Sequence, residues 1–123
     1  MSLEKNKIIV RKGIEALNRK NLSVLDEFMA SDYIDHTNLL HSREEVKQLY
    51  MGTFKDYPDF RRTIKDIIAE GDKVWVRFKI SGTSLSGEKI ELASVNIFRI
   101  VNGKVVEGWT VPQLVKEKKL KVE

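Results

Sequence analysis

The chain has 123 residues, with 22 basic and 18 acidic side chains, a formal net charge of +4 and no cysteine. The lack of cysteine excludes disulfides, thiolate nucleophiles and thiolate zinc sites, and it suits a reducing cytoplasm. The charges are dispersed, and neither a signal-peptide pattern nor an apolar run of about 20 residues occurs, so we expect a cytoplasmic protein without nucleic-acid or membrane partners.

The first part of the chain predicts three helices. Residues 5 to 20 carry apolar side chains at spacings of three and four, the period of an amphipathic helix. A short second helix is predicted over "SVLDEFMA", residues 23 to 30. Ser42, with Glu45 three positions later, has the pattern of a capping box and predicts the start of a third helix that ends before "YPDF".

From residue 60 the apolar period changes from about 3.6 to about 2, which predicts strands. Turn signals at "EGD", "GTSLSG" and "VNGK" follow one another closely and favour an antiparallel meander. Helices followed by strands predict a single α+β domain over residues 1–123, with three helices packed on one face of a mostly antiparallel sheet. Its core is expected over about 5–113, and residues 114–123 are expected to form a charged tail.

The dipeptide Asn102-Gly103 predicts a two-residue hairpin turn. Pairing across this turn places residues whose numbers sum to 205 opposite each other, and opposite residues share a face of the sheet. One predicted face carries Asn96, Phe98, Glu107, Trp109 and Gln113. The opposite face carries Val95, Ile97, Arg99, Val106 and Thr110.

The first of these faces mixes aromatic and polar side chains, as a ligand pocket does. The alternative is that its polar groups belong to an ordinary solvated face and that Trp109 belongs to the core. The second face is too apolar for a freely solvated sheet, which predicts a homodimer.

Three segments carry a resemblance to a known family: "RKGIEALNRKNLSVLDEFMASDYIDHTN", "PDFRRTIKDIIAEGDKVWVRFKISGTSLSG" and "NIFRIVNGKVVEGWTVPQ". Their order and spacing, and above all the pieces "YIDH", "AEGDKV" and "GKVVEGW", resemble the SnoaL-like polyketide cyclases (ester cyclases) of the NTF2-like, ketosteroid-isomerase-like superfamily. The resemblance implies a curved sheet wrapped around helices into a cone, a pocket inside the cone, and commonly a dimer through the outer sheet face.

The resemblance also implies cofactor-independent chemistry, in which a pocket carboxylate removes a proton beside a carbonyl group and polar neighbours hold the enolate. The position of the family's acid, four residues after the last tryptophan, corresponds to Gln113, and the family's "GTH" histidine corresponds to Ser84. An amide cannot accept a substrate proton at neutral pH. His36 of "YIDH" and Glu107 are therefore the residues left for proton transfer.

Two functions stay open. The first is a cofactor-independent cyclase, isomerase or lyase that acts on a small, partly apolar carbonyl compound through His36 or Glu107. The second is a non-catalytic ligand-binding or dimeric interaction module, which Gln113 favours. No metal is expected, because His36 and His41 have no third ligand at a suitable spacing. The residues expected to bind the ligand are Tyr33, Asn96, Phe98, Trp109 and Gln113.

Overall fold

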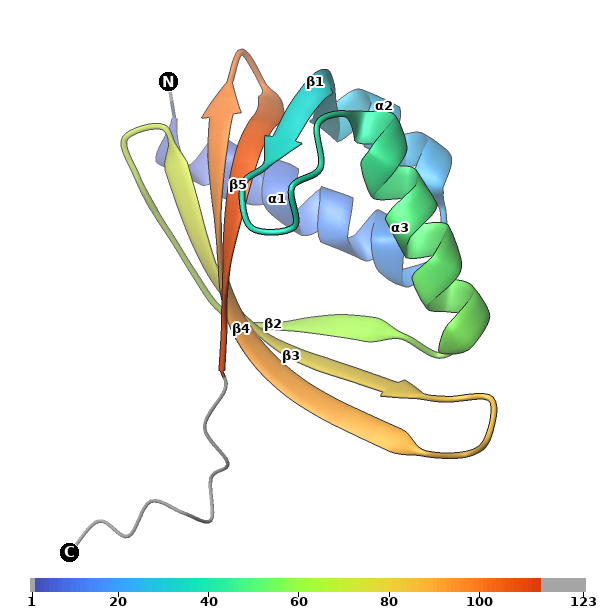
Figure 1. The fold of residues 1–123 in the computed structure, drawn as a ribbon. Helices are drawn as coiled ribbons and strands as arrows, with labels where there is room; N and C mark the ends of the chain where they lie inside the picture. The colour runs from blue at the N-terminus through green and yellow to red at the C-terminus, as the bar shows by residue number, and fades with distance from the viewer. Residues whose placement is uncertain (1, 114–123) are drawn as a thin grey trace, which may run out of the picture.

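The computed structural model describes residues 2–113, and the predicted charged tail lies outside them. A curved five-stranded sheet in the order β1-β5-β4-β3-β2 wraps around three helices, which cover its concave face (Figure 1). The predicted α+β fold with helices on one face is therefore confirmed. The elements are α1 (Leu3–Asn18), a 3-10 turn η1 (Leu22–Val24), α2 (Leu25–Phe28), β1 (Met29–Asp35), α3 (Arg43–Asp56), β2 (Arg61–Glu70), β3 (Lys73–Thr83), β4 (Lys89–Val101) and β5 (Lys104–Pro112).

Local capping sets the starts of the two long helices. The Ser2 side chain accepts the backbone N–H of Lys5 at the start of α1. Ser42 accepts the backbone N–H of Glu45 at 3.1 Å, so the predicted start of α3 is confirmed. Because the first N–H groups of a helix lack partners inside it, such a cap stabilises the helix by about 1 kcal/mol.

The second predicted helix is shorter than expected, because α2 ends at Phe28. Met29 instead begins β1 and pairs with Val105 of β5. This pairing is parallel, whereas the other three strand pairings are antiparallel, so the sheet is mostly antiparallel as predicted. The turn signals could not predict this pair, because they indicate pairing only between strands that are neighbours in the sequence, and β1 and β5 lie far apart along the chain.

The β4–β5 hairpin has the predicted turn, with positive φ at both Asn102 (51°) and Gly103 (79°). Ile100 pairs with Val105 as expected. A β-bulge then leaves Val106 without a partner, so that the numbers of paired residues sum to 206 from that point on.

The bulge reverses the predicted faces of β5. Arg99 pairs with Glu107, and Ile97 pairs with Trp109. Because successive side chains alternate between the faces, a slip of one residue moves each later side chain to the other face. The prediction that Glu107, Trp109 and Gln113 share a face with Asn96 is therefore wrong, and Thr110, predicted on the opposite face, pairs with Asn96.

The hydrophobic core lies between the concave face of the sheet and the helices. Strand β3 contributes alternate buried residues, Val74, Val76, Phe78 and Ile80. Burial of one such side chain stabilises the fold by about 1.5 to 3 kcal/mol. Within residues 2–113, no helix is long and apolar enough to cross a membrane.

Candidate functional site

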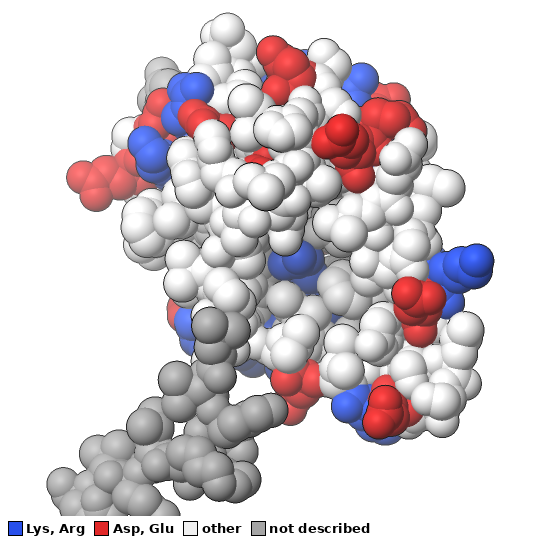
Figure 2. All heavy atoms as spheres, viewed as in Figure 1, with Lys and Arg blue, Asp and Glu red and all other residues white. Residues whose placement is uncertain are grey.

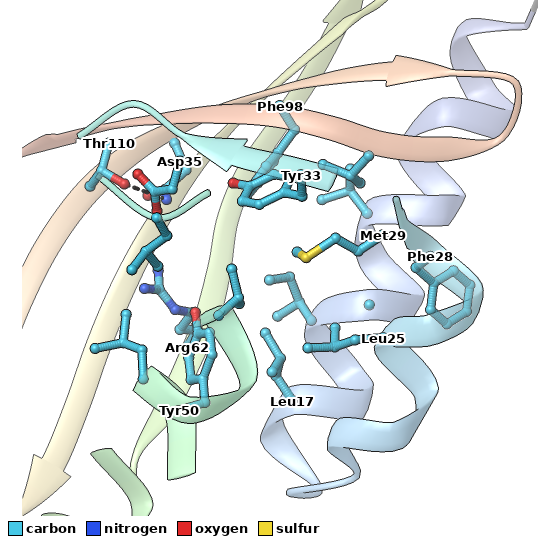
Figure 3. A pocket seen from close by; sticks show the side chains of 18 of the residues that line it. Leu17, Leu25, Phe28, Met29, Tyr33, Asp35, Tyr50, Arg62, Phe98 and Thr110 are labelled. Atoms are coloured by element: carbon cyan, nitrogen blue, oxygen red, sulfur yellow. Dashed lines mark hydrogen bonds between the residues drawn. The ribbon is translucent and has the colours of Figure 1, made fainter. Parts of the chain in front are cut away.

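A cavity of about 290 Å³ lies between the helices and the concave face of the sheet. Figure 2 shows a hollow on this side of the molecule, with basic atoms visible inside it among uncharged side chains. Most of the lining is apolar and comes from α1, α2, α3 and the sheet (Figure 3). Its residues with polar side chains are Tyr33, Asp35, Asn38, Tyr50, Thr53, Arg62, Asn96 and Thr110.

Tyr33 lies on β1 and is only 4% exposed. Its hydroxyl makes no hydrogen bond to any of the residues 2–113, and the cavity lies beside its ring. Burial, and then the negative charge of Asp35, raises the pKa of Tyr33 far above its usual value. The hydroxyl therefore stays protonated at neutral pH and can donate a hydrogen bond.

Gly108 on β5 makes room for the Tyr33 hydroxyl. A Cβ at position 108 would overlap this oxygen and would also lie 3.3 Å from the ring of Phe98. The φ angle of Gly108 is not in the left-handed region, so the glycine is required by space and not by backbone conformation.

Asp35 follows Tyr33 by two positions, so both side chains lie on the concave face. Its Oδ1 accepts the backbone N–H groups of Thr37 (3.0 Å) and Asn38 (2.9 Å), and its Oδ2 accepts Nδ2 of Asn38 (3.0 Å). Asp35 is the one acidic residue among those that line the cavity within residues 2–113. These three hydrogen bonds fix the orientation of the carboxylate.

Asn96 and Phe98 also line the cavity, from β4. The Asn96 side chain is buried, and its Nδ2 donates to Oγ1 of Thr110 at 3.0 Å across the strand pair. Its Oδ1 accepts the hydroxyl of Ser94 at 2.9 Å. The amide is thus held by two hydrogen bonds and retains one N–H for a further acceptor.

Arg62 reaches the cavity from β2. Its guanidinium carbon lies 5.2 Å from the ring centroid of Phe78, 5.8 Å from that of Tyr50 and 5.9 Å from that of Phe60. Within residues 2–113 its buried Nε–H has no acceptor. Figure 3 shows Arg62 beside Tyr50, on another side of the cavity from Phe28.

His36, Glu107 and Trp109 come together on the convex side of the sheet. Nε2 of His36 lies 2.7 Å from Oε1 of Glu107, and the imidazole stacks on the indole of Trp109 with centroids 4.8 Å apart. Glu107 also accepts a hydrogen bond from Nε of Arg99, and Nη1 of the same arginine lies 3.5 Å from Oδ2 of Asp72. The hydrogen bonds from His36 and then from Arg99 lower the pKa of Glu107.

The residues predicted as one site therefore fall into two groups. Tyr33, Asn96 and Phe98 line the cavity, whereas His36, Glu107 and Trp109 do not. Gln113 is also outside the lining, because it is exposed just beyond β5, where its backbone N–H donates to the carbonyl of Ala93 at 2.9 Å.

Sequence reasoning missed Asp35, Arg62 and Thr110 as residues of the cavity. The spacing in "YIDH" could have indicated Asp35, since a strand that turns Tyr33 inward also turns Asp35 inward and His36 outward. Residues 2–113 contain no group of three or more His, Asp or Glu side chains that could hold a metal ion.

Three comparisons relate the chain to known proteins. The family model described as SnoaL-like polyketide cyclase matches residues 7–119. Among solved structures, AclR from Streptomyces galilaeus, described as a candidate hydroxylase, is 29% identical, with 91% of each chain covered and a TM-score of 0.81. No curated protein gives a significant match.

Two more solved structures have the same fold. IdmH from Streptomyces antibioticus, described as a candidate polyketide cyclase, is 25% identical over 88% of this chain and 91% of that chain, with a TM-score of 0.78. TsrD from Streptomyces laurentii is 19% identical over 92% and 91% of the two chains, with a TM-score of 0.83. The family match covers most of the sequence, and the chain therefore belongs to the SnoaL-like polyketide cyclase family.

Proposed function

We propose that the cavity binds a small, partly apolar carbonyl compound and that the protein catalyses proton transfer next to that carbonyl group without a cofactor. The observation that carries this proposal is that a carboxylate, Asp35, and a protonated hydroxyl, Tyr33, line the same largely apolar cavity. Family membership supports a small-molecule ligand.

In the proposed reaction, Asp35 accepts a proton from the carbon next to the carbonyl group. The electron pair of the broken C–H bond forms an enolate, and the Tyr33 hydroxyl donates a hydrogen bond to the developing negative oxygen. A carboxylate has about four acceptor positions, and three of those of Asp35 are occupied by Thr37 and Asn38. One position on Oδ2 is therefore available for the substrate proton.

This proposal assigns different roles to the residues expected from the sequence. Asn96 and Phe98 are assigned to ligand contact, because both line the cavity. His36 and Glu107 are assigned to the cluster on the convex side, because their side chains form a hydrogen bond with each other and neither lines the cavity.

Hydrogen–deuterium exchange of 2-acetylnaphthalene tests the catalytic proposal. The methyl protons of this ketone are weakly acidic, and their loss in D₂O can be followed by proton NMR at neutral pD. We expect the protein to accelerate exchange above the buffer rate. Asp35→Asn should reduce the acceleration by about 10² to 10⁴-fold, and Tyr33→Phe by about 10²-fold.

Glu107→Gln is the matched control, because it also converts a carboxylate to an amide but lies outside the cavity. It should leave exchange unchanged. If Asp35→Asn exchanges the methyl protons as fast as the wild type, the assignment of the base is wrong. If the wild type does not exceed the buffer rate, the catalytic proposal fails.

A non-catalytic ligand-binding role is the second candidate. It is favoured by Gln113, which stands at the position of the family's acid and lies exposed outside the cavity. Binding of 2-acetylnaphthalene without any exchange would support this role over catalysis.

We also propose that the protein forms a homodimer through the convex face of the sheet. A row of apolar residues crosses four strands there: Ile68 pairs with Trp75, Trp75 with Ile97, and Ile97 with Trp109. Ile68 is 62% exposed and Trp75 is 43% exposed. Because an exposed row of apolar side chains is unfavourable in water, we propose that a second copy of the chain packs on this face and buries the row.

A further inference from the structure

The backbone of Arg62 is fixed on an edge of the sheet. Strand β2 is the last strand in the sheet order, so one side of its backbone has no neighbouring strand. Asn18, the last residue of α1, fills this place: its Oδ1 accepts the N–H of Arg62 and its Nδ2 donates to the carbonyl of Arg62, both at 2.9 Å. The arginine side chain is thus directed toward the cavity from an anchored position.

The guanidinium group of Arg62 has no anionic partner among residues 2–113. No carboxylate there lies within ion-pair distance, and the Nε–H is buried without an acceptor. Arg43, Arg77 and Arg99, by contrast, each contact a carboxylate. Arg62 is half-buried, and a cation partly withdrawn from water without an anion is unfavourable. The three aromatic rings around Arg62 offset part of this cost.

The charges of the cavity are separated. Arg62 is the one cationic residue and Asp35 the one anionic residue of the lining within residues 2–113, and the two form no ion pair. In the view of Figure 3 both residues lie on one side of the cavity, and the apolar Leu17, Leu25, Phe28 and Met29 lie on the other. The terminal nitrogens of Arg62 also make no hydrogen bond to residues 2–113 and are the part of the group that a molecule in the cavity would meet.

We propose that Arg62 is the recognition residue for a carboxylate, so that the ligands of this cavity are small apolar, preferably aromatic, carboxylates. This inference rests on the proposed function only in that the cavity binds a small molecule. A carboxylate matches the planar guanidinium with two parallel hydrogen bonds. A phosphate fits less well, because the lining formed by residues 2–113 provides no second cation for its additional charge.

The orientation of the ligand follows from this arrangement. A carboxylate bound at Arg62 leaves the remainder of the molecule to contact the apolar lining on the opposite side of the cavity, where Leu17, Leu25, Phe28 and Met29 lie (Figure 3). The anionic group is expected at Arg62 and not beside Asp35, whose negative charge repels it. The substrate of the proposed proton transfer is accordingly a keto acid with a largely apolar body.

Isothermal titration calorimetry with 2-naphthoate and 2-naphthamide tests the proposal, because the two probes have nearly the same shape and differ in charge. We expect the wild type to bind 2-naphthoate about tenfold to a hundredfold more tightly, the effect of a charge-assisted hydrogen-bonded pair. Arg62→Met keeps an apolar side chain of similar length and removes the charge. It should abolish the preference and leave the affinity for 2-naphthamide unchanged within about twofold.

Arg61→Met is the matched control, since Arg61 is the exposed neighbour on the same strand and does not line the cavity. It should retain the full preference. Asp35→Asn should strengthen 2-naphthoate binding, because it removes the negative charge from the cavity. Arg62→Lys keeps the charge but loses the planar pair of donors, so it should retain only part of the preference, and it serves as the decisive variant if Arg62→Met does not fold.

Equal affinity of the wild type for the two probes would overturn the inference and leave the proposed carbonyl-binding function intact. The inference would also be overturned if Arg62→Met kept the full preference for 2-naphthoate over 2-naphthamide. If Arg62→Met does not fold, a full preference in Arg62→Lys would overturn it instead. Failure of the wild type to bind either probe would also overturn this inference, and the exchange of 2-acetylnaphthalene then decides separately whether the proposed function stands.

Discussion

The imidazole of His36 and the carboxylate of Glu107 meet on the convex side of the sheet, with Nε2 of His36 lying 2.7 Å from Oε1 of Glu107. Glu107 also accepts a hydrogen bond from Arg99, and the ring of His36 stacks on that of Trp109. The two residues that the sequence indicated for proton transfer thus form part of a structural network that joins the end of β1 to β4 and β5.

This network predicts a pH-dependent contribution to stability. The pKa of Glu107 is lowered from its usual value of 4.5, first by His36 and then by Arg99. A carboxyl group with a lower pKa in the folded state stabilises the fold above its unfolded pKa, and this contribution is lost as the pH falls through the folded value. Glu107→Gln should therefore lower the free energy of unfolding by about 1 kcal/mol at neutral pH, and the difference should disappear in acid.

Urea denaturation of both proteins at about pH 7, 5 and 3 measures this difference. Glu88→Gln is the control, because Glu88 is exposed and its side chain makes no ion pair with residues 2–113. A difference for Glu107→Gln that persists undiminished at the lowest pH would contradict the assignment.

Gly108→Ala should disturb the cavity from β5. The added methyl group would overlap the Tyr33 hydroxyl and lie 3.4 Å from the carbonyl oxygen of Ile97, so Tyr33 must move. We expect a loss of about 1 to 3 kcal/mol in the free energy of unfolding, together with weaker binding of 2-acetylnaphthalene. Denaturation and calorimetry measure the two effects.

Gly52→Ala is the matched comparison, because a Cβ at position 52 of α3 would meet no atom within 4 Å. It should raise the free energy of unfolding by about 0.5 to 1 kcal/mol, since alanine restricts the unfolded chain and favours the helix. If Gly108→Ala is as stable as the wild type and binds the ketone equally well, the close contact with Tyr33 is wrong.

Gln113→Asp should not create a catalytic base. The family's acid corresponds to this position, but the side chain of Gln113 is exposed and lies outside the cavity. The exchange rate of 2-acetylnaphthalene should therefore stay within about twofold of the wild type, whereas a base positioned in the cavity gives about 10² to 10⁴-fold. A large gain in exchange would mean that residue 113 reaches the substrate.

Ile97→Lys should dissociate the proposed dimer. Ile97 lies between Trp75 and Trp109 in the apolar row of the convex face, and a lysine there would bring two like charges into the contact. Light scattering should give the mass of a dimer for the wild type and of a monomer for the variant at micromolar concentration, while ligand binding in the cavity is retained. Leu85→Lys in the β3–β4 turn should remain dimeric, and a monomeric wild type would refute the proposal.

The site could be predicted only in part from the sequence. Tyr33, Asn96 and Phe98 were expected to bind ligand and line the cavity, although their roles stay predictions. Asp35 was not among the residues expected to transfer a proton or to bind the ligand. Arg62 was not considered, because a single arginine on a predicted strand has no local feature that distinguishes an inward from an outward position.

Local sequence determined much of the secondary structure. The apolar period indicated α1, Ser42 indicated the start of α3, and Asn102-Gly103 indicated the hairpin turn. Each of these features depends on residues a few positions apart, so the interactions that stabilise it lie within one short segment of the sequence.

Only the tertiary structure decided which side chains share the cavity. The bulge at Val106 has no distinctive residue of its own, yet it moves Glu107 and Trp109 to the convex side and brings Thr110 opposite Asn96. The parallel pairing of β1 with β5 likewise depends on contacts between distant segments. Because the side chains of a strand alternate with a period of two, one unpaired residue reverses the face of all that follow it, and the packing of the whole sheet against the helices determines where that residue is accommodated.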